Sequence, residues 1–269
     1  MTEKEMMLTS LLGCRRVDLY INPETLDTDQ SEQLRGMEER RSQGYPLQYI
    51  IGTCEFMGLT LKVDTRVLIP RPETELLAEA VLEKARSMDI RHLKILDLGT
   101  GSGNIAIALA KYIPGCSITA VDVSEGALEL ARVNAKMNAV DGQITFLKSD
   151  LFSALESPVS LEKFDILVSN PPYVRRIEIS SLPLEVQREP VLALDGGEDG
   201  LDFYRRILRQ ATRFIQEDGF LFLEIGETQK ESLEKIIFIY PGYKLVEFRK
   251  DLCARDRMVV IKNNRMGRL

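Results

Sequence analysis

The stretch Lys94-Ile-Leu-Asp-Leu-Gly-Thr-Gly-Ser-Gly103 sets the fold class of this chain. A short apolar run ends at Leu98, and three glycines follow it at alternate positions. Glycine adopts backbone angles that other residues avoid, and without a Cβ it lets a ligand come close to the main chain. The pattern predicts a buried strand that turns sharply into a helix beside a ligand. A tight turn without a ligand is the competing interpretation of the glycines alone.

The sequence around this stretch alternates between strands and helices. Further strands are predicted at 117–121, 144–148, 164–169 and 219–225, with helices at 74–88, 103–112, 124–137, 200–216 and 227–239. Strands separated by helices form right-handed βαβ units and a parallel sheet. The last two predicted strands, 243–249 and 257–262, leave no room for a helix and should pair as an antiparallel edge hairpin. The fold class is α/β, with a seven-stranded, doubly wound, Rossmann-like sheet.

The chain divides into three parts. Residues 1–52 carry leucines at helical spacing among charged residues and predict a small N-terminal helical domain. Residues 53–69 alternate between apolar and polar side chains and predict a β-hairpin linker. Residues 70–269 hold the α/β domain, whose first helix Thr74 is expected to cap.

Composition and charge exclude several kinds of function. The 269 residues carry 35 Lys and Arg against 41 Asp and Glu, a net charge of −6. This balance argues against a broad contact with nucleic acid, which needs a basic face. The single histidine, His92, argues against a histidine triad or a multi-histidine metal site. The four cysteines form no CxxC pair, and no signal peptide or membrane-length apolar run is evident, which predicts a cytoplasmic protein.

Acidic residues follow the next two predicted strands. Asp122 lies about 20 residues beyond the glycine loop, where a carboxylate can accept both hydroxyl hydrogens of a ribose. Its competing interpretation is a charge at the start of the following helix. Asp150 can accept from an adenine amino group, while Leu151 or Phe152 covers the ring. The GxGxG spacing of the loop differs from the GxGxxG of nicotinamide sites and disfavours a dinucleotide.

The fourth strand ends in Asn170-Pro171-Pro172-Tyr173, which we interpret as the catalytic and substrate-binding tetrad. An amide nitrogen is a poor nucleophile, but the Asn170 side-chain oxygen and a main-chain carbonyl near Pro171 can accept both hydrogens of a planar NH2 group. Held in this way opposite a sulfonium methyl, the nitrogen reacts mainly through proximity and orientation. Tyr173 can pack against the flat acceptor group. No metal is needed. Prolines also simply end strands, which is the competing interpretation.

These motifs together resemble those of the HemK/PrmC family. The segments that carry the resemblance are Leu68-Ile-Pro-Arg-Pro-Glu-Thr-Glu75, Asp97 to Gly103, Ser169-Asn-Pro-Pro-Tyr-Val174, Glu189-Pro190, Ala193 to Gly197, Phe248 to Leu252 and Arg255 to Arg257. Members of that family methylate N5 of the glutamine in the Gly-Gly-Gln motif of class I peptide chain release factors. The resemblance covers residues 44–262.

The resemblance implies S-adenosylmethionine as the methyl donor, with S-adenosylhomocysteine as its product, and class I release factors as the partner. The donor-binding residues expected on this basis are Gly99, Thr100, Gly101, Ser102, Gly103, Asp122, Asp150, Leu151 and Asn170. Arg71, Glu73 and Thr74 would belong to a loop that closes over the site. Residues 1–52 would help to grip the release factor, although this part is shorter than is usual in the family. We expect a monomer that contacts neither nucleic acid nor membrane.

Other functions remain open at this point. An adenine-N6 methyltransferase acting on DNA or RNA would use the same tetrad, although the acidic charge balance disfavours it. A nicotinamide-dependent oxidoreductase is disfavoured by the loop spacing and by the lack of an obvious proton donor. A binding protein could keep the fold without turnover. The cations Arg249, Lys250, Arg255 and Arg257 fit an acidic partner surface, or simply a solvated hairpin face.

Overall fold

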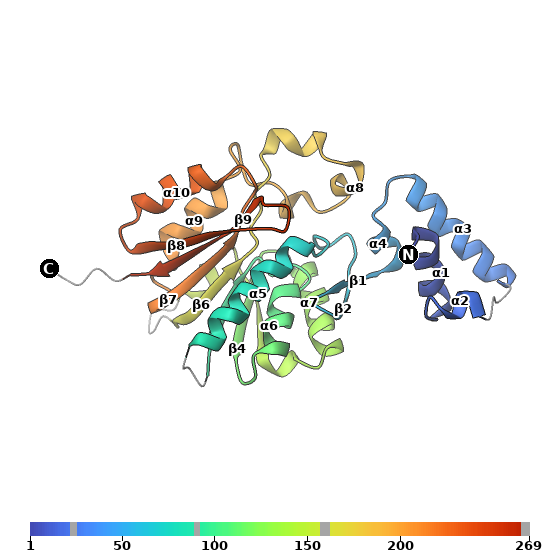
Figure 1. Cartoon of the computed structure of the whole chain (residues 1–269), viewed down its shortest axis with the longest axis horizontal. Helices are drawn as coiled ribbons and strands as arrows, with labels where there is room; N and C mark the ends of the chain where they lie inside the picture. Colours follow the sequence, from blue (N-terminus) through green and yellow to red (C-terminus); the bar gives the residue numbers. More distant parts are fainter. Residues whose placement is uncertain (22–25, 89–91, 157–161, 265–269) are drawn as a thin grey trace.

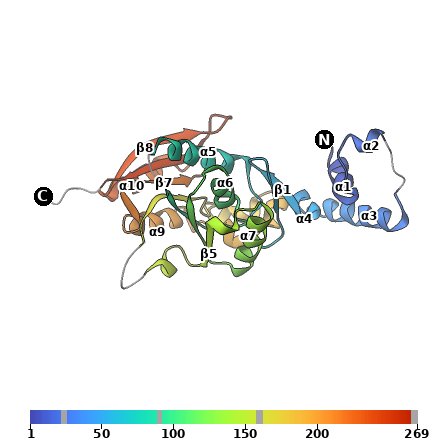
Figure 2. The same cartoon turned by 90° about the horizontal axis from the view of Figure 1, so that it is seen from below.

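The structure is a computed structural model, and it describes residues 1–21, 26–88, 92–156 and 162–264. The main part of the chain forms one seven-stranded sheet with helices on both faces, and the N-terminal helices lie at one end of it (Figures 1 and 2). Along the chain, its strands are β3 (Lys94–Leu98), β4 (Ser117–Asp122), β5 (Ile144–Lys148), β6 (Phe164–Ser169), β7 (Ile215–Glu224), β8 (Tyr243–Lys250) and β9 (Asp256–Asn263).

The sheet has the order β5-β4-β3-β6-β7-β9-β8. Strands β3 to β7 pair in parallel, whereas β9 pairs antiparallel with both β7 and β8. The predicted fold class and the antiparallel hairpin at one edge are therefore confirmed. The order of connection reverses between β3 and β6, and ligands bind outside the carboxyl ends of the strands at such a switch point.

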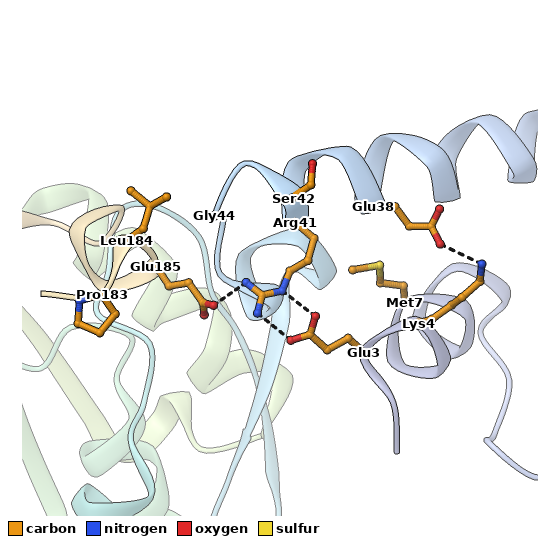
Figure 3. Close-up of a pocket in the computed structure, with 10 residues that line it drawn as sticks. All are labelled: Glu3, Lys4, Met7, Glu38, Arg41, Ser42, Gly44, Pro183, Leu184 and Glu185. Atoms are coloured by element: carbon orange, nitrogen blue, oxygen red, sulfur yellow. Dashed lines mark hydrogen bonds and ion pairs between the residues drawn. The ribbon is translucent and has the colours of Figure 1, made fainter.

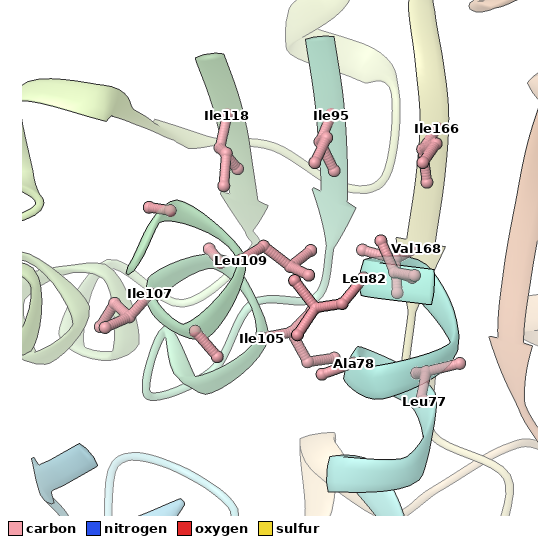
Figure 4. Packing of buried hydrophobic residues seen from close by; sticks show 14 of the residues in the cluster. Leu77, Ala78, Leu82, Ile95, Ile105, Ile107, Leu109, Ile118, Ile166 and Val168 are labelled. Carbon is pink, nitrogen blue, oxygen red and sulfur yellow. The ribbon is translucent and has the colours of Figure 1, made fainter. Parts of the chain in front are cut away.

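Helices cover both faces of the sheet because its central strands are apolar on both sides. The covering helices are α5 (Pro72–Ser87), α6 (Asn104–Tyr112) and α7 (Glu125–Met137) on one face, and α9 (Asp202–Ala211) and α10 (Lys230–Ile239) on the other. Figure 4 shows Ile95, Ile118 and Ile166, from three adjacent strands, above Leu82 of α5 and Leu109 of α6. Each such fully buried side chain contributes about 1.5–3 kcal/mol through removal from water.

The predicted helix over 200–216 was too long. Helix α9 ends at Ala211, and β7 begins at Ile215, which pairs with Phe164 in the sheet. The Phe164 N–H donates to the Phe214 carbonyl at 2.7 Å, so the backbone here bonds to the sheet rather than to a preceding helical turn. Apolar residues at the end of an amphipathic helix resemble those of a buried strand, and only the neighbouring strand distinguishes them.

Thr74 was wrongly predicted as a helix cap. Helix α5 begins at Pro72 after its N-cap residue Arg71, and no side chain caps it. Proline suits the first helical position because its missing N–H would have no partner there. Thr74 therefore lies in the first turn, only 1% exposed, with its hydroxyl turned into the protein.

The N-terminal part has its own small core. Its helices are α1 (Glu3–Leu12), α2 (Asp18–Ile21), α3 (Thr28–Ser42) and α4 (Leu47–Ile51). Thr2 and Asp27 start α1 and α3 with reciprocal capping boxes, and Met7, Leu34 and Leu47 are buried between the helices. Buried leucines at helical spacing explain why this segment folds against itself.

A short hairpin follows, formed by β1 (Thr53–Phe56) and β2 (Leu59–Lys62). Residues 63–69 run on without strand pairing. The Asn134 side chain of α7 holds the outer edge of this hairpin, because its amide bonds both the N–H and the carbonyl of Lys62, at 2.7 and 3.0 Å. Within the described ranges, no helix combines the length and apolar character needed to cross a bilayer.

Candidate active site

A cavity of about 300 Å³ opens at the carboxyl ends of the strands. It lies beside the switch point, where β3 and β6 are adjacent. Its lining includes six of the expected donor-binding residues: Gly99, Gly101, Asp122, Asp150, Leu151 and Asn170. Four chain segments, which follow or end β3, β4, β5 and β6, therefore meet here because parallel strands end at the same edge of a sheet.

The glycine loop forms one wall of this cavity. Gly99 and Gly101 have φ angles of 73° and 56°, and a Cβ on either would meet no atom within 4 Å. These glycines are required by the backbone conformation, and the space beside them is open to a ligand. Gly103, with φ of 83°, is different, because a Cβ there would lie 2.9 Å from Ile107 and 3.2 Å from Ala131. It permits close packing of α6 on α7.

Three of the predicted loop residues do not line the cavity. Thr100 and Ser102 are 2% and 1% exposed, and Gly103 faces the helices. The Thr100 hydroxyl donates to Asp97 Oδ2 at 2.6 Å, so it stabilises the loop on the side that faces away from the cavity. The sequence pattern alone did not separate the residues that face the cavity from those that hold the loop.

Asp122 lies in the cavity and is tied to the loop. Its Oδ2 accepts from the Gly101 N–H and its Oδ1 from the Ser124 N–H, each at 2.9 Å. Burial raises the pKa of this carboxyl, and the two backbone hydrogen bonds oppose the effect. Ser124, rather than Asp122, caps α7, with its hydroxyl accepting from the Ala127 N–H. Each Asp122 oxygen keeps a free lone pair for a ligand hydroxyl.

The three residues predicted to contact adenine follow β5, and they do not all face the cavity. Asp150 is exposed, and both its oxygens lie 2.7 Å from Arg206 Nη2. Leu151 has a φ of 52°, unusual for a non-glycine residue, and turns its side chain into the cavity wall. Phe152 does not reach a ligand, because it is fully buried and stacks on Phe214 with ring centroids 4.7 Å apart. The expectation that Phe152 could cover an adenine ring was wrong.

The tetrad separates this cavity from a second one of about 280 Å³. Pro172 lines the first cavity, whereas Pro171 and Tyr173 line the second. Asn170 lines both, together with Leu68 and Ala193. Asn170 is therefore within reach of a group bound in either cavity.

The main chain of the tetrad is firmly held at its far end. The Val174 N–H donates to the Leu194 carbonyl at 3.0 Å, and Gln229 Nε2 donates to the Tyr173 carbonyl at 3.0 Å. Within the described segments, no group donates to the Pro171 carbonyl, which stays available to a ligand. Burial raises the pKa of Tyr173 well above its ordinary value, so its ring is neutral.

The loop that precedes α5 closes the second cavity. Leu68 and Arg71 line it, and the end of the loop next to α5 is held by Glu189, which is 4% exposed. Glu189 accepts from the Ile69 N–H at 3.0 Å and from the Arg71 guanidinium. Burial raises the pKa of Glu189, and the Arg71 charge opposes it. The expected roles of Arg71 and Glu73 toward a ligand remain predictions.

Family models match two parts of the chain: the Methyltransferase small domain over residues 72–183, and the PrmC N-terminal domain over residues 2–52. The release factor glutamine methyltransferase of Thermodesulfovibrio yellowstonii is 38% identical over 98% of this chain and 92% of its own length. The chain belongs to the release factor glutamine methyltransferase family. The Streptococcus pneumoniae member of this family is 47% identical over 80% of this chain and 74% of its own.

Solved methyltransferase structures share the fold of this family member. The ribosomal protein L11 methylase of Lactobacillus delbrueckii subsp. bulgaricus superposes with a TM-score of 0.55 at 21% identity. The match covers 76% of this chain and 85% of that protein.

Two residues that line the first cavity of this release factor glutamine methyltransferase family member were not predicted from the sequence. Phe203 and Arg206 of α9 line the first cavity, with the Arg206 guanidinium 5.4 Å from the centre of the Phe203 ring. Residues at i and i+3 share a helix face, so their pairing was visible in the sequence. Their proximity to the end of β5 was not, because α9 follows β6 in the chain.

Proposed function

We propose that this protein transfers a methyl group from S-adenosylmethionine to the side-chain amide nitrogen, N5, of the Gly-Gly-Gln glutamine in class I release factors. The observation that carries the proposal is the position of Asn170 in the wall shared by the two cavities. The names of the relatives supply the release factor glutamine as acceptor. The division into a donor cavity and an acceptor cavity supports direct transfer between them.

The first cavity suits the methyl donor. Asp122 offers its carboxylate to the ribose hydroxyls, and Gly99 and Gly101 leave space against the main chain. Leu151 and Phe203 supply apolar walls for the adenine, and Asp150 lies at the rim. S-adenosylmethionine supplies an electrophilic methyl group on a sulfonium. The chain supplies its orientation and its shielding from water.

The second cavity suits the acceptor amide. The Asn170 Oδ1 and the Pro171 carbonyl would accept the two N–H bonds of the glutamine NH2, with Tyr173 in the cavity wall. Held there, the nitrogen would form a bond to the methyl carbon as the carbon–sulfur bond breaks, and the methylated nitrogen, acidic once alkylated, would then release one proton to solvent. Proximity lowers the barrier, and the two carbonyl dipoles stabilise the positive charge that develops on nitrogen.

The remaining expectations complete the proposal. Residues 1–52 would form the docking domain for the release factor, 53–69 the linker and 70–269 the catalytic domain. The enzyme would act as a monomer in the cytoplasm, where release factors work, without contacting nucleic acid or membrane.

One assay tests the acceptor class. The protein is incubated with radiolabelled methyl donor and, in separate reactions, a release factor, DNA or RNA. We expect label on the release factor alone, and none when its Gly-Gly-Gln glutamine is replaced. Label on nucleic acid alone would instead identify an adenine methyltransferase.

Two substitutions test the two cavities separately. Asn170→Ala should leave donor affinity nearly intact and lower kcat by at least ~100-fold, because it removes a polar contact made in the transition state. Asp122→Ala should mainly weaken donor affinity, measured by calorimetry. If Asn170→Ala lost donor affinity and turnover equally, Asn170 would not be an acceptor-side group.

A further inference from the structure

Two buried polar side chains behind Asn170 take part in neither cavity wall. Thr74, in the first turn of α5, is 1% exposed, and Glu224, the last residue of β7, is 2% exposed. Among the residues that the structure describes, no Lys or Arg forms an ion pair with Glu224. Burying a carboxylate without a paired charge is costly, and such a group calls for a specific reason.

Hydrogen bonds connect these two side chains to the tetrad. Asn170 Nδ2 donates to Thr74 Oγ1 at 3.1 Å, and the Thr74 hydroxyl donates to Glu224 Oε2 at 2.7 Å. The Tyr173 hydroxyl donates to the other oxygen, Oε1, at 3.4 Å. Glu224 therefore bonds to the first and last residues of the tetrad, to one of them through Thr74.

The direction of these bonds follows from chemistry. Burial raises the pKa of Glu224 to about 7, against the lowering effects of the Thr74 hydrogen bond and the Arg257 charge. In its carboxylate form Glu224 only accepts hydrogen bonds, so the single hydrogen of the Thr74 hydroxyl then points to Oε2. Because its one hydrogen is donated to Glu224, the Thr74 hydroxyl can only accept a hydrogen bond from Asn170, so Asn170 must supply an N–H donor. Asn170 must present its NH2 to Thr74, which turns its Oδ1 the opposite way. Within the described part of the chain, that Oδ1 has no hydrogen-bond donor of its own.

We infer that Thr74 and Glu224 are positioning residues that fix the Asn170 amide with its oxygen toward the acceptor. The inference rests on the proposed function. With the amide flipped, the Asn170 NH2 would meet the glutamine NH2, and two donors cannot bond. Without Thr74, neither orientation is favoured, and the correct acceptor geometry is present for only part of the time.

Thr74→Val tests this inference, because valine has nearly the shape of threonine but neither donates nor accepts a hydrogen bond. We expect kcat to fall roughly 10- to 100-fold, the scale of a misplaced reacting group. Donor affinity and the KM for the release factor should stay unchanged, since neither cavity wall includes Thr74. Thr74→Ser, which keeps the hydroxyl, should restore kcat. Thr60→Val, the same change at an exposed site of β2, is the matched control.

Two results would overturn the inference: wild-type kcat in Thr74→Val, or a loss in Thr74→Ser as large as in Thr74→Val. If Thr74→Val does not fold, as judged by its thermal transition, Thr74→Ala carries the same test because it also lacks the hydroxyl. The wild-type enzyme is assayed alongside. Its failure to methylate the release factor would refute the proposed function, whereas normal wild-type activity with an active Thr74→Val refutes only the roles of Thr74 and Glu224.

Discussion

Asp97, the fourth residue of β3, is a fully buried carboxylic acid beneath the glycine loop. Its Oδ2 accepts from the Thr100 hydroxyl, whereas its Oδ1 has no hydrogen-bond partner among the described residues. Burial raises the pKa of Asp97 to about 7, against the lowering effect of the Thr100 hydrogen bond. Near neutral pH this residue is therefore balanced between its acid and its carboxylate forms.

This balance predicts a pH-dependent stability. An acid whose pKa is higher in the folded state than in the unfolded chain binds more protons when folded, so its stabilising contribution is lost as the pH rises through about 7. The free energy of unfolding of the wild type, relative to Asp97→Asn, should fall between pH 5 and pH 8 by the order of 2 kcal/mol. Urea denaturation at both pH values measures this. A pH-independent difference would show that the Asp97 pKa is not raised.

At the scale of elements, the segment between β6 and α9 shapes the proposed acceptor cavity. It contains α8 (Leu184–Gln187), two short 3-10 turns and one isolated bridge between Val174 and Asp195, none of which the sequence indicated. Gly196 packs directly against the tetrad: a Cβ there would lie 2.8 Å from the Tyr173 Cα and 2.9 Å from the Pro172 carbonyl oxygen. These are main-chain atoms, so they cannot move aside as a flexible side chain would.

Gly196→Ala should therefore displace the tetrad. We expect kcat to fall by about 100-fold, since a shift of about 1 Å in reacting groups has that effect. Stability should fall by about 1–3 kcal/mol from overpacking. Steady-state kinetics and thermal unfolding measure the two effects. Gly142→Ala is the control, because a Cβ there meets nothing within 4 Å, and it should retain full activity. Unchanged kcat in Gly196→Ala would mean that the tetrad position tolerates movement.

At the scale of the whole molecule, Arg41 of α3 joins the N-terminal helices to the acceptor side. Its guanidinium bonds Glu3 and Glu185, each at 2.7 Å, across a cavity of about 700 Å³ (Figure 3). Beside it, the Arg188 guanidinium lies 4.6 Å from the centre of the Tyr45 ring. The proposed docking domain is thus connected to α8, which belongs to the segment that lines the proposed acceptor cavity.

Arg41→Gln should loosen this connection. Because these ion pairs are partly exposed, the free energy of unfolding should change by less than about 1 kcal/mol. The KM for the intact release factor should rise with kcat unchanged, the result expected when uniform binding is lost. A short Gly-Gly-Gln peptide, too small to reach residues 1–52, should be methylated as before. Arg209→Gln, an exposed arginine of α9, is the charge-matched control. An equal effect on peptide and release factor would argue against a docking role.

The features of this protein that could be predicted from its sequence are either local or follow from the geometry of a parallel sheet. Apolar periodicity placed the five strands of the parallel sheet, and the glycine loop with Asp122 and Asn170 marked one edge of it. The end of α9 at Ala211 was not predictable, because Phe214 and Ile215 suit a buried helix as well as a buried strand.

By itself, the sequence determined the α/β fold, the edge of the sheet that carries the site and the tetrad that ends β6. Local periodicity encodes strands and helices, and parallel strands bring their carboxyl ends together. Only the tertiary structure decided which residues stand behind that edge. Thr74 meets Asn170 across 96 positions of the chain and Glu224 across 150. Such contacts depend on which helix packs against which strand, and no local pattern records that choice.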